Sequence, residues 1–137
     1  MGIEPDLVQL LAAAQAARKQ AYIPYSHFAV GAAVLTSTGQ IFPGCNIENS
    51  AYPVTICAER VALSSAYAAG QRDIVAIAVI ADTPGPVSPC GACRQVMLEL
   101  APHCTVLLAN LQNETLRTSP AELLPGGFTA DSLPHNR

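Results

Sequence analysis

Two short cysteine-bearing stretches place the strongest constraint on how this chain can fold. The first runs from Cys57 to Arg60 and the second from Pro89 to Gln95. Thiolates are good ligands for a dication such as zinc, and a catalytic zinc site has three protein ligands and leaves one position for water. Cys57, Cys90 and Cys93 would supply three ligands, so the fold has to bring the two stretches together.

Two polar residues of the first stretch fit a hydrolytic site. Glu59, two residues after a candidate ligand, is a carboxylate that could move the protons of a bound water. If Cys57 and Cys90 each begin a helix, their thiolates lie at the positive ends of two helix dipoles. Three thiolates around Zn²⁺ still leave an excess of negative charge, and Arg60 would offset it as a hydrogen-bond donor to sulfur.

Other interpretations of the cysteine motif stay open on these residues alone. A CxxC pair is also typical of a redox dithiol or of a structural zinc site. A structural site usually has four protein ligands, and a fourth is not evident because the other cysteines and the histidines lie outside the two stretches. Those other cysteines, Cys45 and Cys104, are interpreted as small buried hydrophobic residues.

The length and the apolar content favour a single domain, residues 1–137, that associates with copies of itself. Half of the residues are apolar and 12% are charged, yet no apolar run reaches the roughly eighteen residues of a membrane span. An apolar share of this size, without any Trp, is more than a small monomer hides, so part of it is predicted to form a subunit interface. We therefore expect an oligomer and no membrane partner.

Charge and cysteine content bear on partners and location. The formal net charge is −3, and the seven Lys and Arg residues are scattered with no basic run to neutralise phosphates. Nucleic acid is therefore not expected as a partner. There is no signal-peptide pattern, and five cysteines in such a chain fit a reducing compartment and metal binding better than a disulfide framework. A cytoplasmic location is expected.

Apolar periodicity and breaker residues predict alternating helices and strands. Helices are expected at 5–20, 57–69, 91–101 and 120–124, and strands at 28–36, 40–48, 73–81, 104–109 and 114–118. The strand-helix-strand order favours parallel pairing, whereas the turn at 111–113 is too short for a crossover helix, so the last strand should be antiparallel. Asn46 and Glu48, near the end of the second strand, should point to the same side.

Four motifs, in this order, resemble the small, homotetrameric, zinc-dependent cytidine deaminases. They are Tyr25–Ala33, Gly44–Asn49, Cys57–Arg60 and Pro89–Gln95, and the resemblance covers nearly the whole chain. It implies a three-layer α/β/α fold with a five-stranded mixed sheet whose last strand is antiparallel. It also implies one Zn²⁺ per subunit, held by the three candidate cysteines, and a homotetramer with pockets shared between subunits.

The resemblance further implies hydrolytic deamination of cytidine and deoxycytidine to uridine and deoxyuridine, with release of ammonia, as in pyrimidine salvage. A zinc-activated water would attack C4 of cytosine while Glu59 protonates N3. Asn46 and Glu48 would hold the ribose 3′-hydroxyl, and Phe28 would pack against the base. The remaining substrate-binding residues implied by the resemblance are Ala58 and Ser88, through their backbones, and Phe128, lent by a neighbouring subunit.

Two alternatives keep the metal site and change its use. A related aminonucleoside, such as an antibiotic, would suit the same motifs, whereas an enzyme for tRNA adenosine or deoxycytidylate would be expected to carry a basic surface or further phosphate-binding residues. A non-catalytic zinc-binding module would use the three cysteines only to brace the fold, and Glu59 would then have no essential role. The resemblance assigns nothing to Leu133–Arg137.

Overall fold

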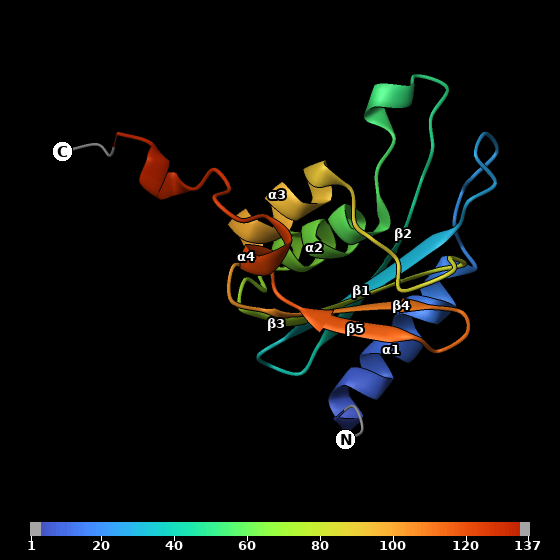
Figure 1. Ribbon diagram of the computed structural model, residues 1–137, viewed down its shortest axis with the longest axis horizontal. Helices are drawn as coiled ribbons and strands as arrows, with labels where there is room; N and C mark the ends of the chain where they lie inside the picture. The colour runs from blue at the N-terminus through green and yellow to red at the C-terminus, as the bar shows by residue number, and fades with distance from the viewer. Residues whose placement is uncertain (1–3, 135–137) are drawn as a thin grey trace.

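Five strands form one mixed sheet in the computed structural model, which describes residues 4–134 (Figure 1). The strands are β1 (Val30–Thr36), β2 (Ile41–Cys45), β3 (Ile74–Ala81), β4 (Thr105–Asn110) and β5 (Thr115–Thr118). The helices are α1 (Pro5–Arg18), α2 (Ala58–Ala68), α3 (Gly91–Leu100) and α4 (Pro120–Leu123), with short 3₁₀ helices η1 (Tyr52–Val54) and η2 (Ala130–Ser132). None of the helices within residues 4–134 combines the length and the apolar character that a membrane crossing needs.

The strand order across the sheet is β2-β1-β3-β4-β5. The strand β5 is antiparallel to β4, which confirms that prediction, and the strands β3 and β4, which flank α3, are parallel. Parallel pairing across α2 was wrong, because β1 lies between β2 and β3 and is antiparallel to both. The reason is burial: β1 is apolar and covered on both faces, whereas β2 carries Pro43 and takes the edge.

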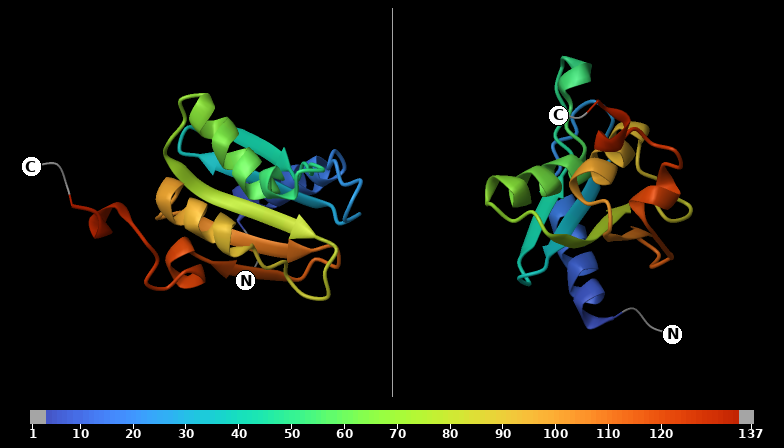
Figure 2. Two further views of the ribbon diagram at one scale, coloured as in Figure 1. Left: turned by 90° about the horizontal axis from the view of Figure 1, so that it is seen from above. Right: turned by 90° about the vertical axis from the view of Figure 1, so that its left-hand side faces the viewer.

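Helices cover both faces of the sheet, which confirms the three-layer α/β/α arrangement (Figure 2). On one face, α1 packs alone through Leu7, Leu10 and Ala14. On the other face, α2 and α3 pack through residues that include Leu63 and Met97. Because α2 and α3 share a face, the residues at their N-terminal ends can meet above the sheet.

A glycine in β2 lets α2 approach the sheet closely. A Cβ at Gly44 would come within 2.6 Å of the Ala58 carbonyl oxygen and of the Ala62 nitrogen. Both are backbone atoms, so no side chain fits at this position without moving the helix. The close contact sets the N-terminal end of α2 beside the residues that follow β2.

The chain leaves the sheet after β2 earlier than the sequence predicts. The strand ends at Cys45 rather than at Glu48, and Ile47 then makes isolated bridges with Tyr22 and Ile56. Residues 46–56, including η1, project from the body of the molecule (Figure 1). The strand β1 begins at Val30 rather than at the predicted residue 28, so Phe28 lies in the segment before it.

Candidate metal centre and active site

Three thiols meet where α2 and α3 begin. Cys57 is the N-cap residue of α2 and Cys90 is the N-cap residue of α3, while Cys93 lies in the first turn of α3. The three Sγ atoms lie within 4.8 Å of one another, and those of Cys57 and Cys90 are 3.8 Å apart. Tetrahedral zinc with Zn–S bonds of about 2.3 Å keeps its sulfur ligands about 3.8 Å apart, so the cluster fits one zinc ion.

Hydrogen bonds and a nearby cation favour the thiolate form of Cys57. The hydrogen bond from the Cys93 thiol is the largest cause that lowers the pKa of Cys57 to about 5, and Arg60 adds a second. Arg60 Nη2 donates to Cys57 Sγ across 3.3 Å. The same contact with Cys57, together with burial, raises the pKa of Cys93. A dication bound here would replace the proton that these two thiols share.

Glu59 is a buried carboxyl beside the thiol cluster. It lies in the first turn of α2, and its side chain is 4% exposed. Burial is the main cause that raises its pKa above the ordinary glutamate value, and the negative charge of Cys57 adds to the effect. A buried carboxyl with a raised pKa is the kind of group that serves as a general acid and base in enzymes.

A cavity of about 210 Å³ contains most of the residues assigned from the sequence. Its walls include Glu59 and two of the three candidate ligands, Cys57 and Cys90. The remaining lining residues are Phe28, Val30, Asn46, Thr55, Ala58, Val87 and Ser88. A small, largely apolar cavity with a few convergent polar groups is typical of a site for a small molecule.

Asn46 shapes one wall of this cavity. Its side chain is 9% exposed, its Oδ1 accepts a hydrogen bond from Val30 N at 2.9 Å, and its Nδ2 donates to the Phe28 carbonyl oxygen at 2.8 Å. The amide therefore fixes the backbone on both sides of Ala29 and holds Phe28 at the cavity. An asparagine amide has two donor hydrogens, so a second one is left for a ligand hydroxyl.

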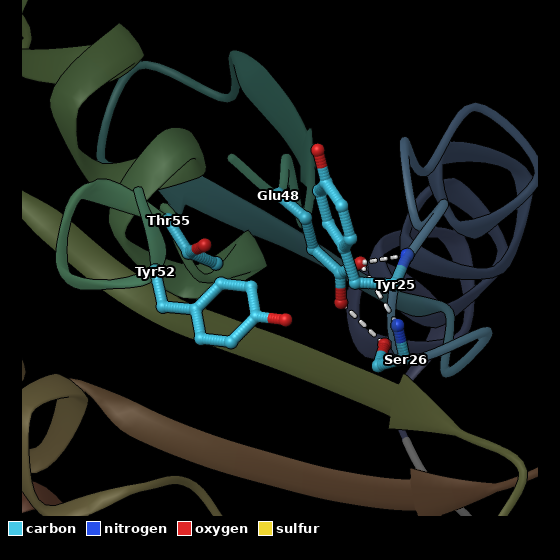
Figure 3. Close-up of a pocket in the computed structure, with 5 residues that line it drawn as sticks. All are labelled: Tyr25, Ser26, Glu48, Tyr52 and Thr55. Atoms are coloured by element: carbon cyan, nitrogen blue, oxygen red, sulfur yellow. Dashed lines mark hydrogen bonds between the residues drawn. The ribbon is translucent and has the colours of Figure 1, made fainter. Parts of the chain in front are cut away.

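Glu48 lies in an adjoining cavity of about 380 Å³, lined by Tyr25, Ser26, Glu48, Tyr52 and Thr55 (Figure 3). Thr55 also lines the cavity of the thiol cluster. The Glu48 carboxylate accepts hydrogen bonds from Tyr25 N at 3.0 Å, from Ser26 N at 3.1 Å and from the Ser26 hydroxyl. These bonds lower the pKa of Glu48, and the bond from the Ser26 hydroxyl has the largest effect.

The structure brings together most of the predicted site, with one exception and some additions. Phe128 is 57% exposed and lines neither cavity; its carbonyl oxygen accepts a hydrogen bond from Gln95 Nε2 at 2.8 Å. Sequence reasoning missed the contributions of Tyr52 and Thr55. The only signal for them is their place in the loop between two motifs, because neither residue type indicates a binding role by itself.

Comparison with known proteins assigns this fold and thiol cluster to a class of zinc-binding deaminases. Residues 5–109 match the family described as "Cytidine and deoxycytidylate deaminase zinc-binding region". This match spans most of the chain, and the chain belongs to the cytidine deaminase family. The family that the four sequence motifs indicated is thereby confirmed.

Individual relatives agree with this assignment. A cytidine deaminase from Halalkalibacterium halodurans is 55% identical over 129 residues, which are 93% of this chain and 98% of the relative. The crystal structure of a cytidine deaminase from Burkholderia pseudomallei is 53% identical, with a TM-score of 0.87, covering 88% of this chain and 98% of that chain. A blasticidin-S deaminase from Bacillus cereus is 36% identical over 108 residues, 73% of this chain and 76% of the relative.

Proposed function

We propose that the protein catalyses the hydrolytic deamination of cytidine and deoxycytidine to uridine and deoxyuridine, with release of ammonia. The observation that carries this proposal is the position of Glu59, a buried carboxyl with a raised pKa that lines the same small cavity as Cys57 and Cys90. A zinc site that only braces the fold has no need for a buried carboxyl beside its ligands, since such burial costs free energy.

In this mechanism Cys57, Cys90 and Cys93 would hold zinc, which when bound would act as a Lewis acid and lower the pKa of water toward about 7. Glu59 takes a proton from the attacking water and delivers it to N3 of the cytosine ring. It then takes the remaining proton from the hydroxyl newly bonded to C4 and carries it to the departing amino group. The C4–O bond forms, the C4–N4 bond breaks, and ammonia leaves.

The walls of the two cavities support roles in substrate binding. Phe28 packs against the base, and the backbones of Ala58 and Ser88 read its amide edge. Asn46 and Glu48 hold the ribose 3′-hydroxyl. Support for the last assignment is geometric, because the cavities that contain these two side chains share Thr55 as a lining residue. A nucleoside that reaches across Thr55 contacts both.

We further propose that the enzyme is a homotetramer whose pockets are shared between subunits, with Phe128 completing the pocket of a neighbour. Support comes from large apolar side chains left exposed in one chain: Tyr52 is 69% exposed, Val54 59% and Phe128 57%. Exposed apolar surface of this kind marks an interaction site. We also propose that residues 1–137 form one domain. A cytoplasmic location is part of the same proposal, because reducing conditions there keep thiolate ligands intact.

An alternative substrate class is a related aminonucleoside, which the 36% identity to a blasticidin-S deaminase supports. The same cavity and the same proton transfers by Glu59 would serve it. The two substrate classes are separated by direct assay, because the sequence motifs are common to both.

The test is the ultraviolet absorbance change on mixing the purified protein with cytidine, deoxycytidine or blasticidin S, with zinc quantified in every sample. Glu59→Gln keeps the shape of the carboxyl and removes its proton transfer. The expected result is turnover of cytidine and deoxycytidine by the parent, and a loss of kcat of at least about 10²-fold in Glu59→Gln at equal zinc content. A zinc-loaded parent that deaminates neither cytidine nor deoxycytidine would overturn the proposal, and turnover of blasticidin S alone would favour the alternative.

A further inference from the structure

Arg94 makes three directed hydrogen bonds from α3 to the segments on either side of it. Its Nε donates to the Pro89 carbonyl oxygen at 2.9 Å, and its Nη2 donates to Ser88 Oγ at 2.6 Å. Its Nη1 donates to the Leu123 carbonyl oxygen at 2.7 Å. One guanidinium therefore joins Ser88 and Pro89, which precede the helix, to Leu123, which lies far along the chain.

The acceptors of Arg94 are neutral: they are two carbonyl oxygens and a hydroxyl. Within residues 4–134 the ion pair formed by an arginine is that of Arg117 with Glu4, and Arg94 has no carboxylate partner. The planar fork instead fixes two carbonyl oxygens and a hydroxyl in defined directions. Ser88 lines the cavity of the thiol cluster, and Cys90, two residues later, is one of the candidate zinc ligands. The bonds of Arg94 to Ser88 and Pro89 therefore hold this cavity wall.

The other side of the fork holds the beginning of the C-terminal segment. Leu123 ends α4, and the chain that follows is held again by Gln95, whose Nε2 donates to the Phe128 carbonyl oxygen at 2.8 Å. Between these points Gly127 lies so close to α3 that a Cβ there would meet Leu98 Cδ2 at 2.5 Å. The segment that carries η2 extends outward from the end of the molecule at which α3 and α4 lie (Figures 1 and 2).

We propose that Arg94 and Gln95 are positioning residues that fix the Ser88–Pro89 turn and the start of the C-terminal segment relative to each other. Arg94 sets the cavity wall of its own subunit, and Gln95 sets the direction in which Phe128 leaves that subunit. The part of this inference that concerns Phe128 rests on the proposed function, in which Phe128 enters a neighbour's pocket. One turn of α3 then positions both the cavity wall of its own subunit and the Phe128 side chain that enters a neighbour's pocket.

Two substitutions test the role of Arg94. Arg94→Met keeps the aliphatic stem and removes every donor, and Arg94→Lys keeps the charge and loses the fork. Both are expected to raise KM for cytidine about tenfold, the equivalent of one charge-assisted hydrogen bond, with kcat within about threefold of the parent and zinc content unchanged. Arg117→Met is the matched control, because it removes a cation whose side chain is 53% exposed and whose partner is Glu4.

A purely structural role predicts a different pattern. It would lower the melting temperature of the Arg94 variants and leave KM at the parent value, and that outcome overturns the inference. Normal KM in Arg94→Lys together with a raised KM in Arg94→Met would also overturn it, because charge rather than the directed fork would then be responsible. Should Arg94→Met fail to fold, Arg94→Lys and Gln95→Ala still decide the question.

A double-mutant cycle tests the role of Gln95. If Gln95 acts by placing Phe128, then Gln95→Ala raises KM, and the variant with both Gln95→Ala and Phe128→Ala has a KM within about twofold of Phe128→Ala alone. Independent, multiplying effects would show that Gln95 does not act through Phe128. Turnover of cytidine by the parent is measured first, so that a failure of the proposed function is seen separately from a failure of this inference.

Discussion

Arg60 Nη2 donates a hydrogen bond to Cys57 Sγ across 3.3 Å, within the first turn of α2. The contact joins the main nearby cation to the ligand that comes from α2. Hydrogen bonds of this kind from residues around a metal site orient the ligand and stabilise its charged form.

Loss of this contact should weaken zinc binding. Replacement of Arg60 by glutamine removes the positive charge that offsets three thiolates, so the zinc dissociation constant is expected to rise about 10- to 100-fold. Competition with a chromophoric chelator at fixed pH measures it. The control is Arg72→Gln, since Arg72 lies over the ring of Tyr67 and away from the thiols. Equal zinc affinity in parent and Arg60→Gln would contradict the role given to Arg60.

The pH dependence of stability should report on Glu48. Hydrogen bonds from Ser26 and Tyr25 lower its pKa in the folded protein. A lowered folded-state pKa contributes stability that is present above the unfolded pKa and is lost as pH falls through the folded value. The difference in melting temperature between the parent and Glu48→Gln should therefore stay constant from neutral pH down to about 4.3, the ordinary glutamate value, and shrink only below it. A difference that already shrinks at about pH 6 would contradict this assignment.

Zinc removal should make some cysteines reactive and leave others inert. In chelator-treated protein at about pH 8, Cys57 and Cys90 are expected to react with iodoacetamide, because the first has a lowered pKa and the second is exposed. Cys104 should stay unlabelled, since it is 2% exposed and burial raises its pKa to about 12. Mass spectrometry of peptides from zinc-loaded and zinc-free protein provides the comparison. Equal labelling of Cys57 in both forms would mean that it is not a ligand.

Gly44 should tolerate no side chain. In Gly44→Ala the new Cβ would press on backbone atoms of Ala58 and Ala62, so α2 has to shift. The expected loss in the free energy of unfolding is about 1–3 kcal/mol by urea titration. KM for cytidine should rise as well, because Ala58 and Glu59 move with the helix. Gly85→Ala is the control: no atom lies within 4 Å of a Cβ at that position, so its stability should change little.

Local patterns in the sequence were sufficient for the elements of the fold and for the metal cluster. The apolar run of β3 and the cysteine spacing on α3 each carry their signal within a few residues. No local pattern predicts that β1 lies between β2 and β3, because the strand order depends on which of the two hairpin strands is covered on both faces. The motifs indicated Asn46 and Glu48 as a pair, but not that their side chains would line two adjoining cavities.

Contacts between segments that are far apart in the chain could not be predicted from the sequence. Arg94 belongs to a motif recognised for its cysteines, and nothing local indicates that its guanidinium reaches Leu123. The burial of Glu59 is a similar case, since a glutamate in the first turn of a helix is usually solvated. Side chains that act over such sequence separations become visible only when the packing of the layers is known.

The thiols and Glu59 stand at the beginnings of two packed helices, whereas Phe28, Asn46, Glu48 and Ser88 stand on connecting segments. In the proposed function, reactivity and selectivity are thus assigned to separate parts of one architecture. A change in the connecting segments can redirect the protein to a different base or sugar while the proton-transfer apparatus stays intact. Such a division explains in physical terms how one helix-and-sheet framework supports deaminases that differ in the molecule they accept.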